Sequence, residues 1–193
     1  IYRPSTSYAL AKQGIEASLN ALQLDFIDLL LIHEPYREAE EMYPALEEAY
    51  RDGRLGAIGV SNFNAARHAA FLRSCTVIPA VNQVEAHVFF QQRELLEDMK
   101  AYGTHMQAWS PFAAGKNDLF DNSVLRAIGL AYGKTPAQIA LNYLVRQGIS
   151  VIPKSSRKER MKENLGVFDF QLRDEDMRRI RALDKGKTLF GWY

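Results

Sequence analysis

Short, largely apolar runs alternate along this chain with longer segments of helical period, and this alternation limits the fold more than any other feature of the sequence. The five runs cover residues 26–33, 55–61, 80–86, 105–110 and 150–153. Runs of this kind are typical of strands that are covered on both faces in a parallel sheet. We therefore predict five parallel strands.

Segments with the period of an amphipathic helix lie around these runs. We predict helices over residues 7–22, 39–52, 65–73, 91–102, 123–132, 136–147, 158–165 and 173–183. Capping residues agree with these limits, since Asn64 precedes the third helix and Thr135 with Pro136 opens the sixth. The alternation indicates an α/β fold, either an open doubly wound sheet or a closed barrel of eight strand–helix units. Five units alone do not close a barrel.

Charge and cysteine content argue against several classes of protein. The 24 Lys and Arg residues nearly balance 23 Asp and Glu residues, so no bulk attraction to nucleic acid or an anionic membrane is expected. Cys75 is the only cysteine and cannot form an intrachain disulfide, and no apolar stretch reaches the roughly 18 residues that span a bilayer. The start at Ile1 lacks a signal-peptide pattern, and we interpret it as a cut. We expect one domain over residues 1–193, a cytoplasmic location, and a monomer or weak homo-oligomer.

Polar side chains stand at the end of every predicted strand, where parallel α/β folds bind their ligands. They are His33 and Glu34, Ser61 and Asn62, Gln83 with Glu85 and His87, Trp109 and Ser110, and Lys154 with Ser155 and Ser156. Each group has a structural alternative: a hydrogen-bonded structural histidine, a turn with a helix cap, an amide that satisfies backbone groups, or a core tryptophan. Together, five such strand ends suit a flat, polar, heteroaromatic ligand.

The end of the last predicted strand has the most specific pattern, because cationic and hydroxyl side chains cluster there at the start of a predicted helix. The group consists of Lys154, Ser155, Ser156 and Arg160, followed by Glu163 and Asn164. A helix start offers free N–H groups and a positive dipole end, and the added cations suit a phosphate monoester. The structural alternative is a solvated helix start with an additional lysine. The sequence has no glycine-rich G-x-G-x-x-G loop, which disfavours a Rossmann dinucleotide site.

The chain resembles the aldo-keto reductases, a family of (β/α)8 TIM-type barrels that use NADPH without a Rossmann motif. The resemblance rests on blocks in family order and spacing that span nearly the whole chain. They are LDFIDLLLIH (24–33), GRLGAIGVSNF (53–63), PAVNQVEAH (79–87), AWSPF (108–112), GKTPAQIALNYLVRQG (133–148) and VIPKSSRKERMKENLGVFDFQL (151–172). The chain is similar to the C-terminal part of such a barrel.

The resemblance implies a role for each strand-end group. His33 matches the active-site histidine, which hydrogen-bonds the carbonyl oxygen of the substrate. The positions that match cofactor-binding ones are Ser61, Asn62 and Gln83 for the nicotinamide carboxamide, Trp109 for stacking on the nicotinamide ring, Ser110 and Phe112 for the pyrophosphate, Lys154, Ser155, Ser156 and Arg160 for the 2′-phosphate, and Glu163 and Asn164 for adenine. These matches favour NADPH over NADH.

The reaction that the resemblance implies is hydride transfer to an aldehyde or ketone, with a proton from a tyrosine whose pKa a lysine and a carboxylate lower. In the family these three residues lie upstream of the LLLIH strand, and no position of this chain matches them. We therefore expect the isolated 193-residue chain to lack turnover. Small oxo-acids, keto-sugars and α-dicarbonyls are the expected substrates.

Two other interpretations stay open on the sequence. A non-catalytic NADP(H)-binding or redox-sensing subunit, or an inactive fragment, would keep the cofactor half of the site alone. A phosphate-binding barrel of the aldolase kind would need a Schiff-base lysine, and Lys154 is better explained as a phosphate ligand. We expect His68 to face solvent on a helix and His87 to be structural. Because the histidines and Cys75 form no metal-site motif, we predict no bound metal.

Overall fold

The computed structural model describes residues 1 and 5–191, and these divide into two compact units. The first unit comprises Ile1–Gln83 and Glu94–His105, and the second comprises Val84–Arg93 and Met106–Tyr193.

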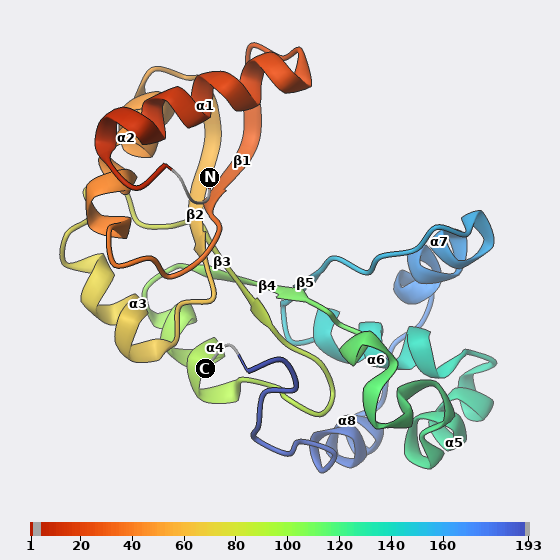
Figure 1. Ribbon diagram of the computed structural model, residues 1–193. Helices are drawn as coiled ribbons and strands as arrows, with labels where there is room; N and C mark the ends of the chain where they lie inside the picture. The colour runs from red at the N-terminus through yellow and green to blue at the C-terminus, as the bar shows by residue number, and fades with distance from the viewer. Residues whose placement is uncertain (2–4, 192–193) are drawn as a thin grey trace. The chain divides into compact units, whose positions relative to one another are not determined.

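The predicted strands and helices are confirmed, with ends that differ by at most a few residues (Figure 1). The strands are β1 (Ile27–Ile32), β2 (Leu55–Ser61), β3 (Val81–Glu85), β4 (His105–Trp109) and β5 (Ser150–Val151), in the order β1-β2-β3-β4-β5. The helices are α1 (Tyr8–Leu22), α2 (Ala39–Arg51), α3 (Ala65–Leu72), α4 (Arg93–Ala101), α5 (Ser123–Tyr132), α6 (Pro136–Val145), α7 (Lys158–Leu165) and α8 (Asp174–Arg181). Within the described ranges, no helix combines the length and hydropathy needed to cross a bilayer.

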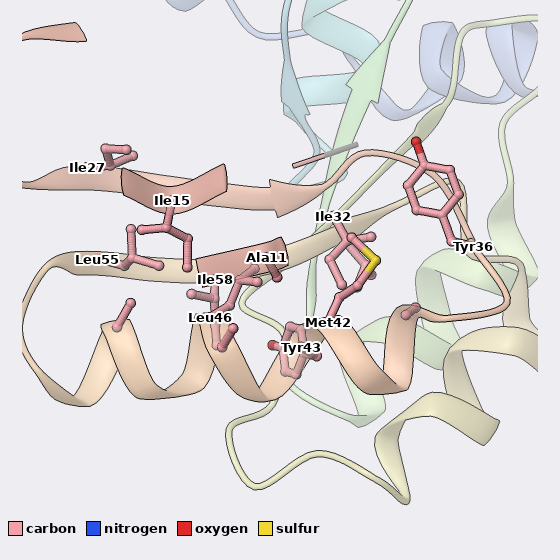
Figure 2. Close-up of a cluster of buried hydrophobic side chains, with 14 of the residues drawn as sticks. Ala11, Ile15, Ile27, Ile32, Tyr36, Met42, Tyr43, Leu46, Leu55 and Ile58 are labelled. Carbon is pink, nitrogen blue, oxygen red and sulfur yellow. The ribbon is translucent and has the colours of Figure 1, made fainter. Parts of the chain in front are cut away.

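The first unit is built on the parallel strands β1, β2 and the start of β3. Ile32 lies opposite Val60 in the β1–β2 pair, and Gly59 lies opposite Val81 in the β2–β3 pair. Helices α1 and α2 pack on each other beside β1 and β2 (Figure 1). Their apolar faces and the inward residues of both strands form one buried cluster (Figure 2). This burial, rather than helix propensity, stabilises the unit and aligns the ends of its strands.

Helix limits follow from local capping. The Asn64 carboxamide oxygen accepts a hydrogen bond of 2.9 Å from the Arg67 backbone N–H and begins α3. Thr135 begins α6 through a capping box with Gln138, and Pro136 occupies the first turn. Helix α5 ends at Gly133, whose φ of 62° lies in the left-handed region that glycine adopts without steric cost.

Two segments of the second unit differ from the sequence prediction. Strand β5 ends at Val151, two residues earlier than predicted, and Pro153 lacks the N–H that a longer parallel ladder would use. A 3₁₀ segment, η1 (Ala113–Asp121), follows β4 where no helix was predicted. Five residues inside η1 have non-helical backbone angles, so it carries no apolar period that sequence patterning could detect.

The prediction for His68 is wrong, because its side chain is fully buried in the first unit. Its Nε2 atom lies 3.1 Å from the Thr104 hydroxyl, its Nδ1 atom lies 3.7 Å from an Asp98 carboxylate oxygen, and its ring meets the edge of Tyr102. A single polar residue in a short helix gives no sequence signal for burial, since only the packing of α3 against the Thr104 segment encloses it. His87 is also fully buried, in agreement with a structural role.

Burial of His68 predicts a loss of stability in mild acid. Desolvation lowers the pKa of His68 in the folded chain, and the nearby Asp98 opposes this only in part. The unfolded chain takes up a proton near pH 6.5, so the free energy of unfolding should fall as the pH drops from about 6.5 toward the lower folded value. Urea denaturation measures the free energy of unfolding at pH 7.5 and pH 5.5. The difference between the two pH values should be smaller for His68→Gln than for the unchanged protein. An equal pH-dependent change in the free energy of unfolding in both proteins would show that the titration of His68 does not cause it.

Candidate functional site

The first unit brings four predicted site residues to adjacent strand ends. His33 follows Ile32, which is opposite Val60, so His33 lies level with Ser61 at the end of β2. Ser61 in turn pairs with Gln83 on β3. The His33 side chain is 65% exposed, with Nδ1 4.0 Å from a Glu34 carboxylate oxygen. An exposed imidazole at a strand end is accessible to a substrate, unlike the buried His68.

Asn62 adopts a backbone conformation that the sequence did not predict. Its φ is 60°, in the left-handed region, and its N–H donates a hydrogen bond of 2.8 Å to the Gln83 carbonyl. Asparagine tolerates this region better than most residues. The bond continues the β2–β3 ladder by one step, and it keeps the Asn62 and Gln83 backbones together where β2 ends.

The second unit contains a cavity of about 320 Å³ at the starts of α6 and α7. Six of the residues predicted to bind the cofactor line it: Phe112, Lys154, Ser155, Arg160, Glu163 and Asn164. These residues are separated by up to 52 positions in the chain and line the same pocket. Their roles toward a ligand stay predictions.

The electrostatics of this cavity favour an anion. Neither Lys154 nor Arg160 forms an ion pair with any residue that the structure describes. The Ser155 hydroxyl accepts a hydrogen bond of 3.1 Å from the Arg157 N–H, which orders the turn before α7. Glu163, the acidic residue of the lining, accepts a hydrogen bond from the Thr135 hydroxyl. Uncompensated cations beside two helix N-termini make this a favourable place for a phosphate.

Sequence reasoning missed four residues of the cavity lining: Phe120, Thr135, Pro136 and Ala137. In the sequence, Thr135 and Pro136 indicate only a helix start, although a helix N-terminus that lines a pocket also favours anion binding. Phe120 belongs to the unpredicted η1 segment, and its ring centroid lies 5.7 Å from that of Phe112. The two rings supply a flat apolar wall.

Three predicted cofactor residues of the second unit do not line the cavity. Ser156 lies outside it, although it follows Ser155 directly. Trp109 ends β4, and its ring contacts Phe190 at a centroid distance of 5.2 Å. Ser110 follows with a φ of 51°, and its carbonyl accepts a hydrogen bond of 2.7 Å from the Ala113 N–H. Trp109 is therefore the last residue of β4, and Ser110 begins the turn that leads from β4 into η1.

Parallel strands with polar groups at their carboxyl ends are typical of α/β proteins, and a cationic pocket at a helix start is a feature that such proteins use to bind phosphate groups. The model of the aldo/keto reductase family matches residues 2–185. The chain is 40% identical over 190 residues to glyoxal reductase of Bacillus subtilis, a match that covers 98% of this chain and 68% of that protein. This chain belongs to the aldo-keto reductase family. It spans about two thirds of the length of the curated relatives it matches.

Solved structures agree with this membership. The aldo-keto reductase MGS-M4, from a Medee basin deep-sea metagenome library, superposes with a TM-score of 0.95 at 36% identity and covers 98% of this chain and 71% of its own. The aldo-keto reductase AKR2E5 of the silkworm Bombyx mori has been solved in complex with NADPH. It superposes with a TM-score of 0.92 at 35% identity, and the match covers 97% of this chain and 63% of that chain. The fold is therefore that of the family, and the part of the chain that the structure describes contains five strands of its parallel barrel.

Proposed function

We propose that this chain is part of an NADPH-dependent oxidoreductase that reduces aldehyde or ketone carbonyls to alcohols. The observation that carries the proposal is the cavity of the second unit, where Lys154, Ser155 and Arg160 stand beside Glu163 and Asn164. Two unpaired cations with hydroxyl donors suit the 2′-phosphate that distinguishes NADPH from NADH. The complex of AKR2E5 with NADPH supports the same cofactor.

The residues of this chain would bind and orient the reactants. NADPH supplies the hydride that adds to the carbonyl carbon. The exposed imidazole of His33 would donate a hydrogen bond to the carbonyl oxygen of the substrate and would stabilise negative charge on that oxygen. By the family resemblance, Ser61, Asn62 and Gln83 would hold the nicotinamide carboxamide, and Trp109 would stack on the nicotinamide ring. The proton that completes the alcohol comes from the family's tyrosine, to which no residue of this chain corresponds.

Small α-dicarbonyl compounds are the substrates that we propose first. The similarity to glyoxal reductase supports this class, because glyoxal is its smallest member. Small oxo-acids and keto-sugars present the same polarised carbonyl and form the next group to test. Oxidation of NADPH by the full-length protein, followed at 340 nm with glyoxal, an oxo-acid and a keto-sugar, tests both the reaction and the preference. Binding of NADPH without turnover of any carbonyl would instead favour a non-catalytic NADP(H)-binding subunit.

Removal of either pocket cation should weaken NADPH binding selectively. Lys154→Ala or Arg160→Ala in the full-length protein deletes a charge-assisted contact to the 2′-phosphate, which is worth about 1.5–3 kcal/mol. The dissociation constant of NADH, which lacks this phosphate, should change little. Isothermal titration calorimetry with both cofactors measures the difference. Lys158→Ala is the matched control, because Lys158 is exposed on α7 but does not line the cavity. Equal losses for NADPH and NADH would refute the 2′-phosphate assignment.

A further inference from the structure

The end of the second unit folds back as an irregular segment of residues 184–191, which we call the strap. It begins where the Lys185 N–H donates a hydrogen bond of 2.8 Å to the Phe89 carbonyl. The Lys185 ammonium group reaches Asn117 of η1 at 2.9 Å. The match to the family model ends at residue 185, so nearly all of the strap lies beyond it.

A buried carboxylate anchors the middle of the strap. The Glu85 side chain, fully buried at the end of β3, accepts a hydrogen bond of 2.8 Å from the Leu189 N–H and another from the Thr188 hydroxyl. His87, also fully buried, lies 3.1 Å from the same carboxylate. A buried carboxylate is costly unless hydrogen bonds satisfy it, so the strap and Glu85 stabilise each other.

Thr188 links the buried Glu85 carboxylate to the backbone of Phe190. Its hydroxyl oxygen accepts hydrogen bonds of 3.1 Å from the Phe190 N–H and 3.0 Å from the Gly191 N–H. Lys116 of η1 donates to the Leu189 carbonyl at 2.8 Å, and its ammonium group lies 4.2 Å from the centre of the Phe190 ring. The Phe190 backbone is therefore held from β3 and from η1.

The held ring contacts the tryptophan proposed to stack on the nicotinamide. The centroids of Phe190 and Trp109 lie 5.2 Å apart, with 59° between the ring planes. Such aromatic contacts stabilise one orientation of each ring beyond the effect of buried area. If the indole is already held in one orientation before binding, less conformational entropy is lost when a second ring stacks on it.

We propose that Glu85 and Thr188 are positioning residues that hold Phe190 as a brace for the Trp109 indole. The inference rests on the proposed function, because it gives the strap a part in binding the nicotinamide half of NADPH. Phe190 and Thr188 act through Trp109 and not through the phosphate pocket. Loss of the brace should therefore weaken only ligands that carry a nicotinamide ring.

The test uses Thr188→Val, which removes the hydroxyl at nearly constant volume, and Phe190→Ala, which removes the ring. We expect NADPH to bind about two- to tenfold more weakly to either variant, the range of one aromatic contact. Adenosine 2′,5′-bisphosphate, the half of NADP that lacks nicotinamide, should bind unchanged. Thr188→Ser keeps the hydroxyl and should restore NADPH binding. Phe168→Ala removes an exposed phenylalanine of the same unit and should change neither ligand.

Tryptophan emission gives a second readout that needs no ligand. These 193 residues contain two tryptophans, so in a Trp192→Phe background of the 193-residue chain the tryptophan emission comes from Trp109. Thr188→Val should shift this emission to the red and increase quenching by acrylamide. Unchanged emission, or equal weakening of NADPH and the bisphosphate, would overturn the brace. Tighter NADPH binding would also overturn it, because Phe190 would then compete with the nicotinamide. If the unchanged protein fails to bind NADPH, the proposed function fails, and the emission of Thr188→Val still decides whether the strap orients Trp109.

Discussion

Replacement of His33 by alanine should lower kcat for carbonyl reduction about 100- to 1,000-fold in the full-length protein, the usual loss when one donor to a developing oxyanion is removed. The dissociation constant of NADPH should stay the same, because no cofactor contact is proposed for this imidazole. Stopped-flow measurement of hydride transfer and fluorescence titration of NADPH separate the two quantities.

The position of His33 allows an effect on catalysis to be distinguished from an effect on the structure of the site. The His33 side chain is 65% exposed, so its removal leaves no cavity in the core. His105→Ala is a suitable control, because His105 is an exposed histidine at the start of β4, away from the strand ends. Parallel losses in kcat and in NADPH affinity would show that His33 supports the structure of the site and does not contact the substrate.

The second large effect is expected at Gly59, in the middle of β2. A Cβ atom at this position would lie 2.3 Å from the Val81 carbonyl oxygen and 2.7 Å from Leu31 Cδ2. Because Val81 belongs to the paired strand β3, relief of the clash requires β2 and β3 to separate. Gly59→Ala should therefore lower the free energy of unfolding by about 3 kcal/mol, the upper end of the usual cost of overpacking in a rigid core.

Urea denaturation followed by circular dichroism measures this loss. Gly53→Ala is the matched control, since a Cβ at Gly53 would meet no atom within 4 Å and only its φ of 73° opposes the change. That backbone strain alone should cost about 1 kcal/mol. Equal destabilisation by both substitutions would show that the sheet accommodates a side chain at Gly59. The same clash should disturb the Ser61–Gln83 pair at the strand ends, so NADPH affinity should fall with stability in Gly59→Ala.

Most secondary structure was predictable because its signals are local. Leu55–Ser61, Ser123–Tyr132 and Lys158–Leu165 have the limits that the sequence predicted. Apolar runs mark covered strands, and caps such as Asn64 mark helix starts wherever they occur. The η1 segment was not predicted as a helix because five of its residues have non-helical backbone angles and the segment shows no helical period.

The sequence alone determined the parallel α/β class, the family resemblance and the identity of the strand-end groups, since all three depend on residue type and spacing. Tertiary structure decided which of these groups meet. Only packing encloses His68, joins Lys154 and Arg160 with Thr135 and Phe120 in one cavity, and leaves Ser156 outside it. It also places Thr188 against Glu85, 103 residues away in the chain. Such contacts depend on chain segments that local periodicity cannot relate, because burial and charge compensation are set by neighbours in space and not by neighbours in sequence.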